Sequence, residues 1–87
     1  MYAVVTLFLV LITYNTWTGE KLETRSYQWT VGIPEYVSPR QILIEEIELC
    51  RIKGVAEAIK MSGYYNARGI LSASTNVDCE WEMGQGT

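Results

Sequence analysis

Residues 2–14, YAVVTLFLVLITY, decide the fold of this chain. The stretch carries no charge, and it is rich in β-branched and aromatic residues, which favour strands. Successive side chains of a strand point to opposite faces, and here both faces are apolar. The two faces would carry Val4, Phe8, Val10 and Ile12 on one side and Val5, Leu7, Leu9 and Leu11 on the other. A strand of this kind lies in the centre of a sheet and is covered on both sides.

A signal segment or a membrane-anchoring helix is the alternative interpretation of residues 2–14. The stretch is shorter than the roughly 20 residues that cross a bilayer as a helix. No basic side chain precedes it, although a signal peptide begins with a basic region. We therefore expect a strand, in a soluble protein of the cytoplasm.

Length and charge limit the function classes. The 87 residues make one domain, residues 1–87, with 48% hydrophobic and 20% charged residues, an ordinary globular composition. The net charge is −3, and acidic and basic residues balance over residues 1–40, so the excess negative charge lies in residues 41–87. No cluster of Lys or Arg is present, which argues against direct binding of nucleic acid. A basic protein surface is the better electrostatic match.

The middle of the chain predicts a hairpin followed by a helix. Residues 21–31 alternate as a second strand after a turn at residues 15–20. The helix is expected over residues 39–61, with Ser38 as N-cap, Pro39 in the first position and Gln41 completing a capping box. The pair Ser62-Gly63 is expected to end it.

The C-terminal third predicts one or two further strands. Residues 70–73 could form a short strand and residues 74–76 a turn, before a strand at residues 77–83 and a frayed tail at residues 84–87. The order is then β-β-α-β-β, or β-β-α-β if residues 70–73 stay irregular. The fold class is α+β, an antiparallel sheet with one helix packed on one face. Because the helix covers one face only, we expect a homodimer formed sheet on sheet, or a partner protein, to cover the other.

The helix carries one broad apolar arc with two charged residues in it. The arc consists of Leu43, Ile44, Ile47, Cys50, Ile52, Val55, Ala58, Ile59 and Met61. Glu48 and Arg51 interrupt it at i,i+3 spacing. They form either an ion pair with each other at the margin of the arc or a polar contact inside an interface. Gly54 indicates a bend or a close backbone contact.

Apolar and acidic residues alternate along residues 77–83, VDCEWEM. We expect Val77, Cys79, Trp81 and Met83 to face the core and Asp78, Glu80 and Glu82 to face solvent. The three carboxylates would lie about 6.5–7 Å apart, similar to successive phosphates of a nucleic-acid strand. One interpretation is an edge strand whose charges prevent aggregation. The other is a row that meets Lys and Arg side chains of a nucleic-acid-binding protein, together with Glu45 or Glu46.

Catalytic and metal chemistry find little support in the sequence. The chain has no histidine, the commonest general base and metal ligand. Cys50 and Cys79 are 29 positions apart. A disulfide between them is one alternative, but two cysteines do not make a disulfide framework, and we expect buried free thiols. No phosphate-binding loop, dinucleotide fingerprint or paired CxxC is present. We therefore expect no enzymatic activity, no metal and no cofactor.

The leading hypothesis is a small acidic protein that acts by protein–protein interaction. Its concrete form is a phage- or mobile-element-encoded inhibitor, of the anti-CRISPR or anti-restriction type, that occludes a basic nucleic-acid-binding surface. The expected partner-binding residues are Asp78, Glu80 and Glu82, together with a loop containing Tyr64, Tyr65 and Arg68. The alternative is a structural or assembly subunit of a virion or larger complex. Such a subunit would self-associate through an apolar sheet face made of Val5, Leu7, Leu9 and Leu11.

Overall fold

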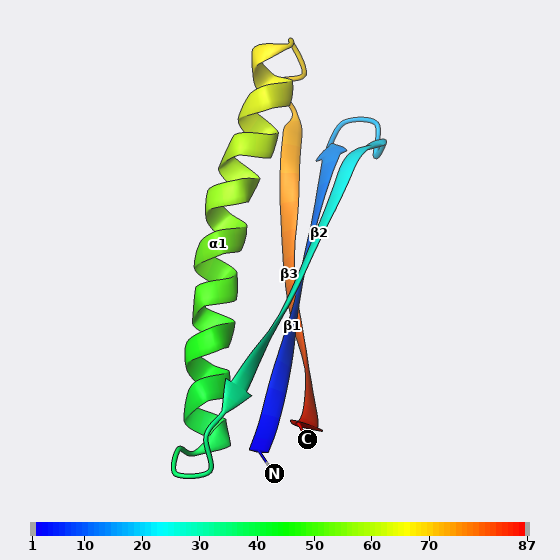
Figure 1. Cartoon of the computed structure of the whole chain (residues 1–87). Helices are drawn as coiled ribbons and strands as arrows, with labels where there is room; N and C mark the ends of the chain where they lie inside the picture. The colour runs from blue at the N-terminus through cyan, green and yellow to red at the C-terminus, as the bar shows by residue number, and fades with distance from the viewer. Residues whose placement is uncertain (1, 87) are drawn as a thin grey trace.

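The computed structural model describes residues 2–86, which form a three-stranded antiparallel sheet and one long helix (Figure 1). The elements are β1 (Tyr2–Asn15), β2 (Lys21–Ile33), α1 (Pro39–Ala67) and β3 (Ala73–Gly86). The strand order is β2-β1-β3, and α1 lies along one face of the sheet. The molecule is elongated, with extents of 52 × 17 × 15 Å. The expected α+β fold is confirmed, in its β-β-α-β form.

β1 is the central strand, as its two apolar faces predicted. It pairs with β2 from Ala3 to Tyr14 and with β3 from Tyr2 to Asn15. Of residues 70–73, the first three are irregular and Ala73 begins β3, which corresponds to the second of the two expected element orders. The long pairing with β3 overturns two other expectations: residues 74–76 are strand and not a turn, and residues 84–86 belong to β3 and not to a frayed tail. Because β1 offers backbone hydrogen-bond partners over its whole length, β3 extends as far as β1 does.

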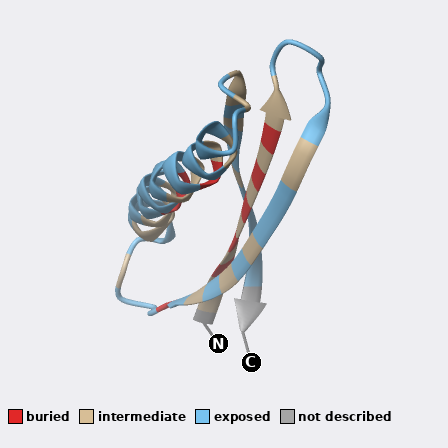
Figure 2. Ribbon diagram, turned by 90° about the horizontal axis from the view of Figure 1, so that it is seen from above, coloured by how far each residue is buried: buried red, intermediate tan, exposed pale blue. Residues whose placement is uncertain are grey.

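The face of β1 beneath α1 is the fully buried one. Its side chains Val5, Leu7, Leu9, Leu11 and Thr13 are 0% exposed. These residues are the red segments of β1 in Figure 2. The expectation that Val5, Leu7, Leu9 and Leu11 form a surface for self-association is therefore wrong. The row that no helix covers is the other one, made of Val4, Phe8, Val10 and Ile12, all of which are partly exposed.

α1 runs six residues beyond the expected stop. Gly63 lies inside the helix, and the chain leaves it at Arg68, followed by Gly69 with φ +95°. One glycine costs a helix only about 1 kcal/mol, and tertiary contacts offset that cost here. Ser62 hydrogen-bonds Thr75 of β3 at 2.7 Å, and the hydroxyl of Tyr65 donates to the carbonyl of Leu22 in β2 at 3.3 Å.

α1 begins at Pro39, the residue that the sequence predicts, although the expected capping box does not form. Ser38 has the extended backbone of an N-cap and Pro39 takes the first position, yet the Ser38 side chain makes no capping hydrogen bond. The backbone carbonyl of Ser38 accepts from the backbone N–H of Gln41 at 3.1 Å. The side chain of Gln41 points along the helix to Glu45. Proline alone, whose missing N–H needs no partner, marks this helix start.

Cys50 and Cys79 form a disulfide, so the expectation of two free thiols is wrong. Their Cα atoms lie 6.3 Å apart, and the bond joins the middle of α1 to the middle of β3. Cys50 is 0% exposed and packs in one core cluster with Leu9, Leu11 and Met61. The helix therefore has a covalent attachment to the edge strand in addition to its apolar contacts.

Gly54 allows the close approach of α1 to the sheet. A Cβ atom at this position would lie 2.3 Å from Cγ1 of Val77 and 3.1 Å from Cδ1 of Leu9. Gly54→Leu should therefore lower the free energy of unfolding by about 1–3 kcal/mol, because the added side chain overpacks a filled site. Denaturant unfolding followed by circular dichroism measures the change.

The matched control for Gly54 is Gly63→Leu in the same helix. No atom lies within 4 Å of a Cβ at Gly63, and the position is exposed. We expect this variant to be about 0.5–1 kcal/mol more stable than the wild type, because leucine favours a helix more than glycine does. Equal effects at the two glycines would contradict the close packing of α1 at Gly54.

Candidate functional site

The three acidic residues of β3 lie on the open sheet face, the face turned away from α1. Asp78 pairs with Val10, Glu80 with Phe8 and Glu82 with Thr6. Paired residues of neighbouring strands share a face, so Asp78, Glu80 and Glu82, named here the carboxylate row, flank the partly exposed apolar row of β1. All three are exposed. The expected orientation of this strand is confirmed.

The other edge of the open sheet face is polar but uncharged in its middle. There β2 presents Thr24, Ser26, Gln28 and Thr30 opposite Ile12, Val10, Phe8 and Thr6 of β1. The hydroxyls of Thr6 and Thr30 lie 3.0 Å apart and hydrogen-bond each other. Across its width the face thus changes from hydroxyl and amide groups through an apolar row to carboxylates.

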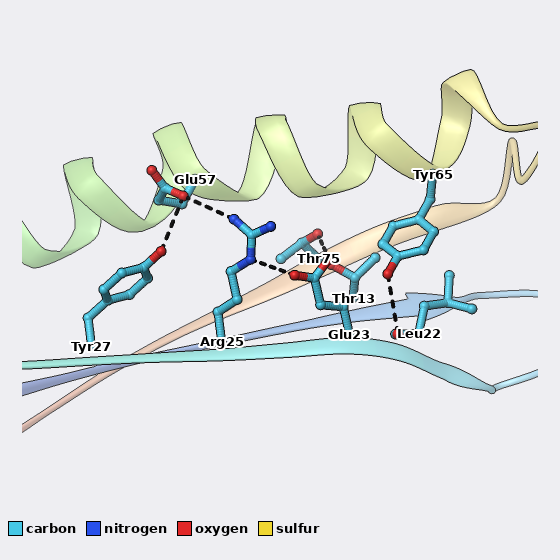
Figure 3. A network of polar contacts seen from close by, with 8 residues as sticks. All are labelled: Thr13, Leu22, Glu23, Arg25, Tyr27, Glu57, Tyr65 and Thr75. Carbon is cyan, nitrogen blue, oxygen red and sulfur yellow. Dashed lines mark hydrogen bonds and ion pairs between the residues drawn. The ribbon is translucent and has the colours of Figure 1, made fainter.

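A network of polar contacts around Arg25 lies on the other side of the sheet, between β2 and α1 (Figure 3). Arg25 of β2 pairs with Glu23 and approaches Glu57 of α1 at 3.6 Å. Glu57 also pairs with Lys60 at 3.7 Å and accepts a long hydrogen bond of 3.5 Å from the hydroxyl of Tyr27. The adjacent carboxylate of Glu23 raises the pKa of Arg25 above its usual value, so this guanidinium stays charged.

Lys53 is held by aromatic rings on the same side. Its ammonium lies 4.9 Å from the ring centroid of Tyr27 and 5.5 Å from that of Trp29, both cation–π distances.

No ion pair joins the carboxylate row to a basic residue anywhere in the part of the chain that the structure describes, residues 2–86. Lys21, which pairs with Tyr14 at one end of β2, is the basic residue that the register places on the open sheet face. The negative charge of this face is therefore uncompensated along its middle.

The predicted loop of Tyr64, Tyr65 and Arg68 is the last turn of α1 and its C-cap, so the expectation of a loop is wrong. The guanidinium of Arg68 lies 3.5 Å from the ring centroid of Tyr64, and the two tyrosine rings meet edge to face at 5.1 Å. Partial burial, together with the charge of Glu23, raises the pKa of Tyr65. The hydrogen bond from the Tyr65 hydroxyl to the carbonyl of Leu22 joins α1 to β2, which is a structural role.

The structure does not bring the two expected groups of partner-binding residues together. Tyr64, Tyr65 and Arg68 follow α1 on one side of the sheet, whereas the carboxylate row faces away on the other side. Glu45 and Glu46 lie on α1 as well, so the expectation that they join the row is wrong. The candidate site consists of the carboxylate row and the apolar row beside it.

The apolar side of β3 faces the helix layer but is incompletely covered. Val77, Trp81 and Met83 share the face of Leu11, Leu7 and Val5, and their exposed fractions are 36%, 49% and 40%. Cys79, held by the disulfide, is covered further. The incomplete cover follows from the edge position of β3, since α1 shields only one flank of an edge strand.

Two further properties of residues 2–86 bear on the function classes. No group of three or more Cys, Asp or Glu side chains comes close enough to hold a metal ion within this range. α1, the one helix described, is not apolar enough to cross a membrane.

Comparisons with known proteins add no relative: no protein-family model, no curated protein and no solved structure matches this chain.

Proposed function

We propose that this chain is a non-enzymatic binding protein whose open sheet face docks against a basic surface of a partner protein. The observation that carries the proposal is the carboxylate row of Asp78, Glu80 and Glu82, which is exposed and without an ion-pair partner among residues 2–86. Such a row attracts a positive surface and gives the encounter an orientation.

The apolar row of β1 would supply the contact area that charges alone lack. Val4, Phe8, Val10 and Ile12 run beside the carboxylate row and are partly exposed. Exposed ion pairs contribute only about 0–1 kcal/mol each, so stable binding needs apolar burial next to them. The two rows side by side, one charged and one apolar, suit a partner that has Lys or Arg side chains beside an apolar patch.

Nucleic-acid-binding proteins are the partner class that the spacing favours. Alternate residues of β3 place successive carboxylates about 6.5–7 Å apart along a straight edge, so a surface that tracks a phosphate backbone has basic groups at a similar repeat. We propose that the chain occludes such a surface on a host complex, in the manner of a phage- or mobile-element-encoded inhibitor of the anti-CRISPR or anti-restriction type.

The proposed inhibitor acts in the cytoplasm of the host cell, and this location puts a condition on the disulfide. Cytoplasmic thiols are kept reduced, so Cys50 and Cys79 would be thiols there. The proposal therefore requires that the reduced protein keeps its fold and its binding. Binding that is lost on reduction would move the site of action to an oxidising compartment.

Charge reversal of the row tests the proposal. The triple variant Asp78→Lys, Glu80→Lys, Glu82→Lys has a net charge of +3 in place of −3. We expect it to fold, because all three positions are exposed, and to lose the partners that the wild type captures from a bacterial lysate, as read by mass spectrometry.

The control for charge reversal has the same net charge with the row intact. The variant Glu20→Lys, Glu45→Lys, Glu46→Lys changes the turn after β1 and the helix only. It should capture the same basic partners as the wild type. If the two triple variants lose the same proteins, net charge alone explains the capture and the row is not a site.

Assembly through the same open sheet face is the second candidate function. It is favoured by the apolar row, in which Phe8 and Ile12 stay partly exposed in the single chain. Under this hypothesis Phe8→Glu abolishes self-association, and added salt leaves it unchanged. Binding to a basic partner weakens as salt rises, since exposed charges are screened over about 8 Å at physiological ionic strength.

A further inference from the structure

α1 has a second apolar face, on the side away from the sheet. Its inner face carries Cys50, Gly54 and Met61, all buried. The outer helix stripe consists of Ile44, Glu48, Ile52, Val55 and Ile59, at spacings of four, four, three and four residues. Such spacing follows one line along a helix and is the pattern of a helix–helix seam.

The four apolar side chains of the outer helix stripe are all exposed to solvent, although such side chains are normally buried. Ile44 is 57% exposed, Ile52 61%, Val55 54% and Ile59 69%. The single apolar arc expected for α1 is therefore divided, with one part on the sheet and the other in solvent. The sheet cannot bury both, because α1 touches β1 and β3 with one side only.

Two oppositely charged side chains without partners lie in the middle of α1, Glu48 in the outer helix stripe and Arg51 directly beside it. Glu48 and Arg51 are both exposed, and neither side chain forms an ion pair or hydrogen bond with any residue from 2 to 86. The expected ion pair between them is therefore not formed. Glu48 and Arg51 carry opposite charges. This part of the helix surface is therefore electrostatically complementary to the same surface of a second copy in the antiparallel orientation.

We propose that the outer helix stripe binds the same stripe of a second copy of this chain, with the two helices antiparallel about a two-fold axis near residues 49 and 50. In this arrangement Glu48 faces Arg51 of the second copy, and by symmetry Arg51 faces its Glu48. Ile44 then packs on Val55 of the second copy. A parallel pairing would instead place like charges opposite each other, which is unfavourable.

The surface of α1 is hollowed where this pairing needs it. One hollow is lined by Ile44, Ile47, Glu48, Arg51 and Ile52. Its first four members stand at i, i+3, i+4 and i+7, the four corners of a hole that receives a side chain from a facing helix. The antiparallel pairing places Ile52 of the second copy over this hollow.

A second hollow lies one heptad nearer the start of α1. It is lined by Ser38, Arg40, Gln41, Ile44 and Glu45. The same pairing places Ile59 of the second copy there, seven residues after Ile52. Two hollows and two isoleucines at the same heptad spacing make the stripe complementary to itself in shape as well as in charge.

The dimer so formed leaves the open sheet face free. Its layers are sheet, helix, helix and sheet, so each copy presents its carboxylate row on an outer surface, and the proposed function does not depend on the dimer. A single helix-to-helix contact falls below the roughly 1,200 Å² of a standard interface. We therefore expect a reversible dimer with a dissociation constant on the order of micromolar.

Charge exchange tests the pairing by sedimentation equilibrium across a range of concentrations. Glu48→Arg and Arg51→Glu each place like charges opposite one another, and each should weaken the dimer at least about tenfold. The double variant Glu48→Arg, Arg51→Glu should restore it. A mixture of the two single variants should form a mixed dimer, because one stripe is then wholly basic and the other wholly acidic at these positions.

Two further variants make the result decisive. Ile52→Glu should yield a folded monomer that unfolds at the same temperature as the wild type when both are measured below the dissociation constant of the dimer, whereas Phe8→Glu on the open sheet face should leave the dimer unchanged. A wild type that stays monomeric at high concentration overturns the proposal. So does a dimer that survives Ile52→Glu, or one that only Phe8→Glu dissociates, which would place the interface on the sheet.

Discussion

Replacing both Cys50 and Cys79 by alanine is expected to lower the free energy of unfolding by about 3–4 kcal/mol. The disulfide closes a loop with a sequence separation of 29 residues, and a loop of that length restricts the unfolded chain by about this amount. It also joins α1 to the edge strand β3, whose other apolar side chains, Val77, Trp81 and Met83, remain partly exposed to solvent. Guanidinium unfolding of the oxidised wild type and of the double variant measures the difference.

Chemical reduction of the wild type is the control for this loss. The reduced protein should unfold at nearly the same denaturant concentration as the double alanine variant, because each lacks the same cross-link. A domain of this size has about 4–13 kcal/mol of stability, so both forms are expected to stay folded at room temperature. A reduced wild type as stable as the oxidised one would show that the bond adds nothing to the packing of α1 on β3.

Leu9→Ala is expected to cost about 2–5 kcal/mol and to lower the melting temperature by roughly 10 °C or more. Leu9 is 0% exposed and lies in the core cluster with Cys50 and Met61. Its Cδ1 would lie 3.1 Å from a Cβ atom at Gly54 of α1. Truncation leaves a cavity that these constrained neighbours cannot fill. Thermal unfolding by circular dichroism measures the loss.

The same substitution at Leu71 is the matched control for Leu9. Leu71 is 79% exposed in the connection between α1 and β3. Its replacement by alanine should change the free energy of unfolding by no more than about 0.5 kcal/mol. Equal losses at Leu9 and Leu71 would be incompatible with a core between β1 and α1.

The order of elements could be predicted because three local signals agreed. Residues 2–14 are apolar on both faces and rich in β-branched residues, which favours a central strand, and Pro39 after Ser38 marks a helix start. Residues 77–83 alternate without a break, which gives a strand with one acidic face. Each signal depends on neighbouring residues alone, so no tertiary information was needed.

The covered face of β1 could not be predicted, because its two faces are almost equally apolar. The register with β3 decides it: Glu80 pairs with Phe8, and a carboxylate cannot be buried unpaired under a helix. The face of Phe8 is therefore open and the face of Leu9 lies beneath α1. Register depends on contacts between residues about 70 positions apart, which no local pattern reports.

The end of α1 and the state of the cysteines depended on tertiary contacts as well. Gly63 looked like a stop, yet Ser62 and Tyr65 hold the next turn against β3 and β2. The spacing of Cys50 and Cys79 says nothing about their distance in space, which is set by the position of α1 over β3. The second apolar face of α1 did have a signal in the sequence, since Ile44, Ile52, Val55 and Ile59 follow one line on the helix.

Competition with nucleic acid tests the central claim, that the carboxylate row occludes a nucleic-acid-binding surface. A nucleic-acid-binding protein captured by the wild type would be loaded with labelled DNA or RNA and titrated with the wild type and with the Asp78→Lys, Glu80→Lys, Glu82→Lys variant. We predict that the wild type releases the nucleic acid, that the triple variant does not, and that release weakens as salt rises. A ternary complex of captured protein, nucleic acid and wild-type chain would contradict the claim, because the row would then lie away from the surface that binds nucleic acid.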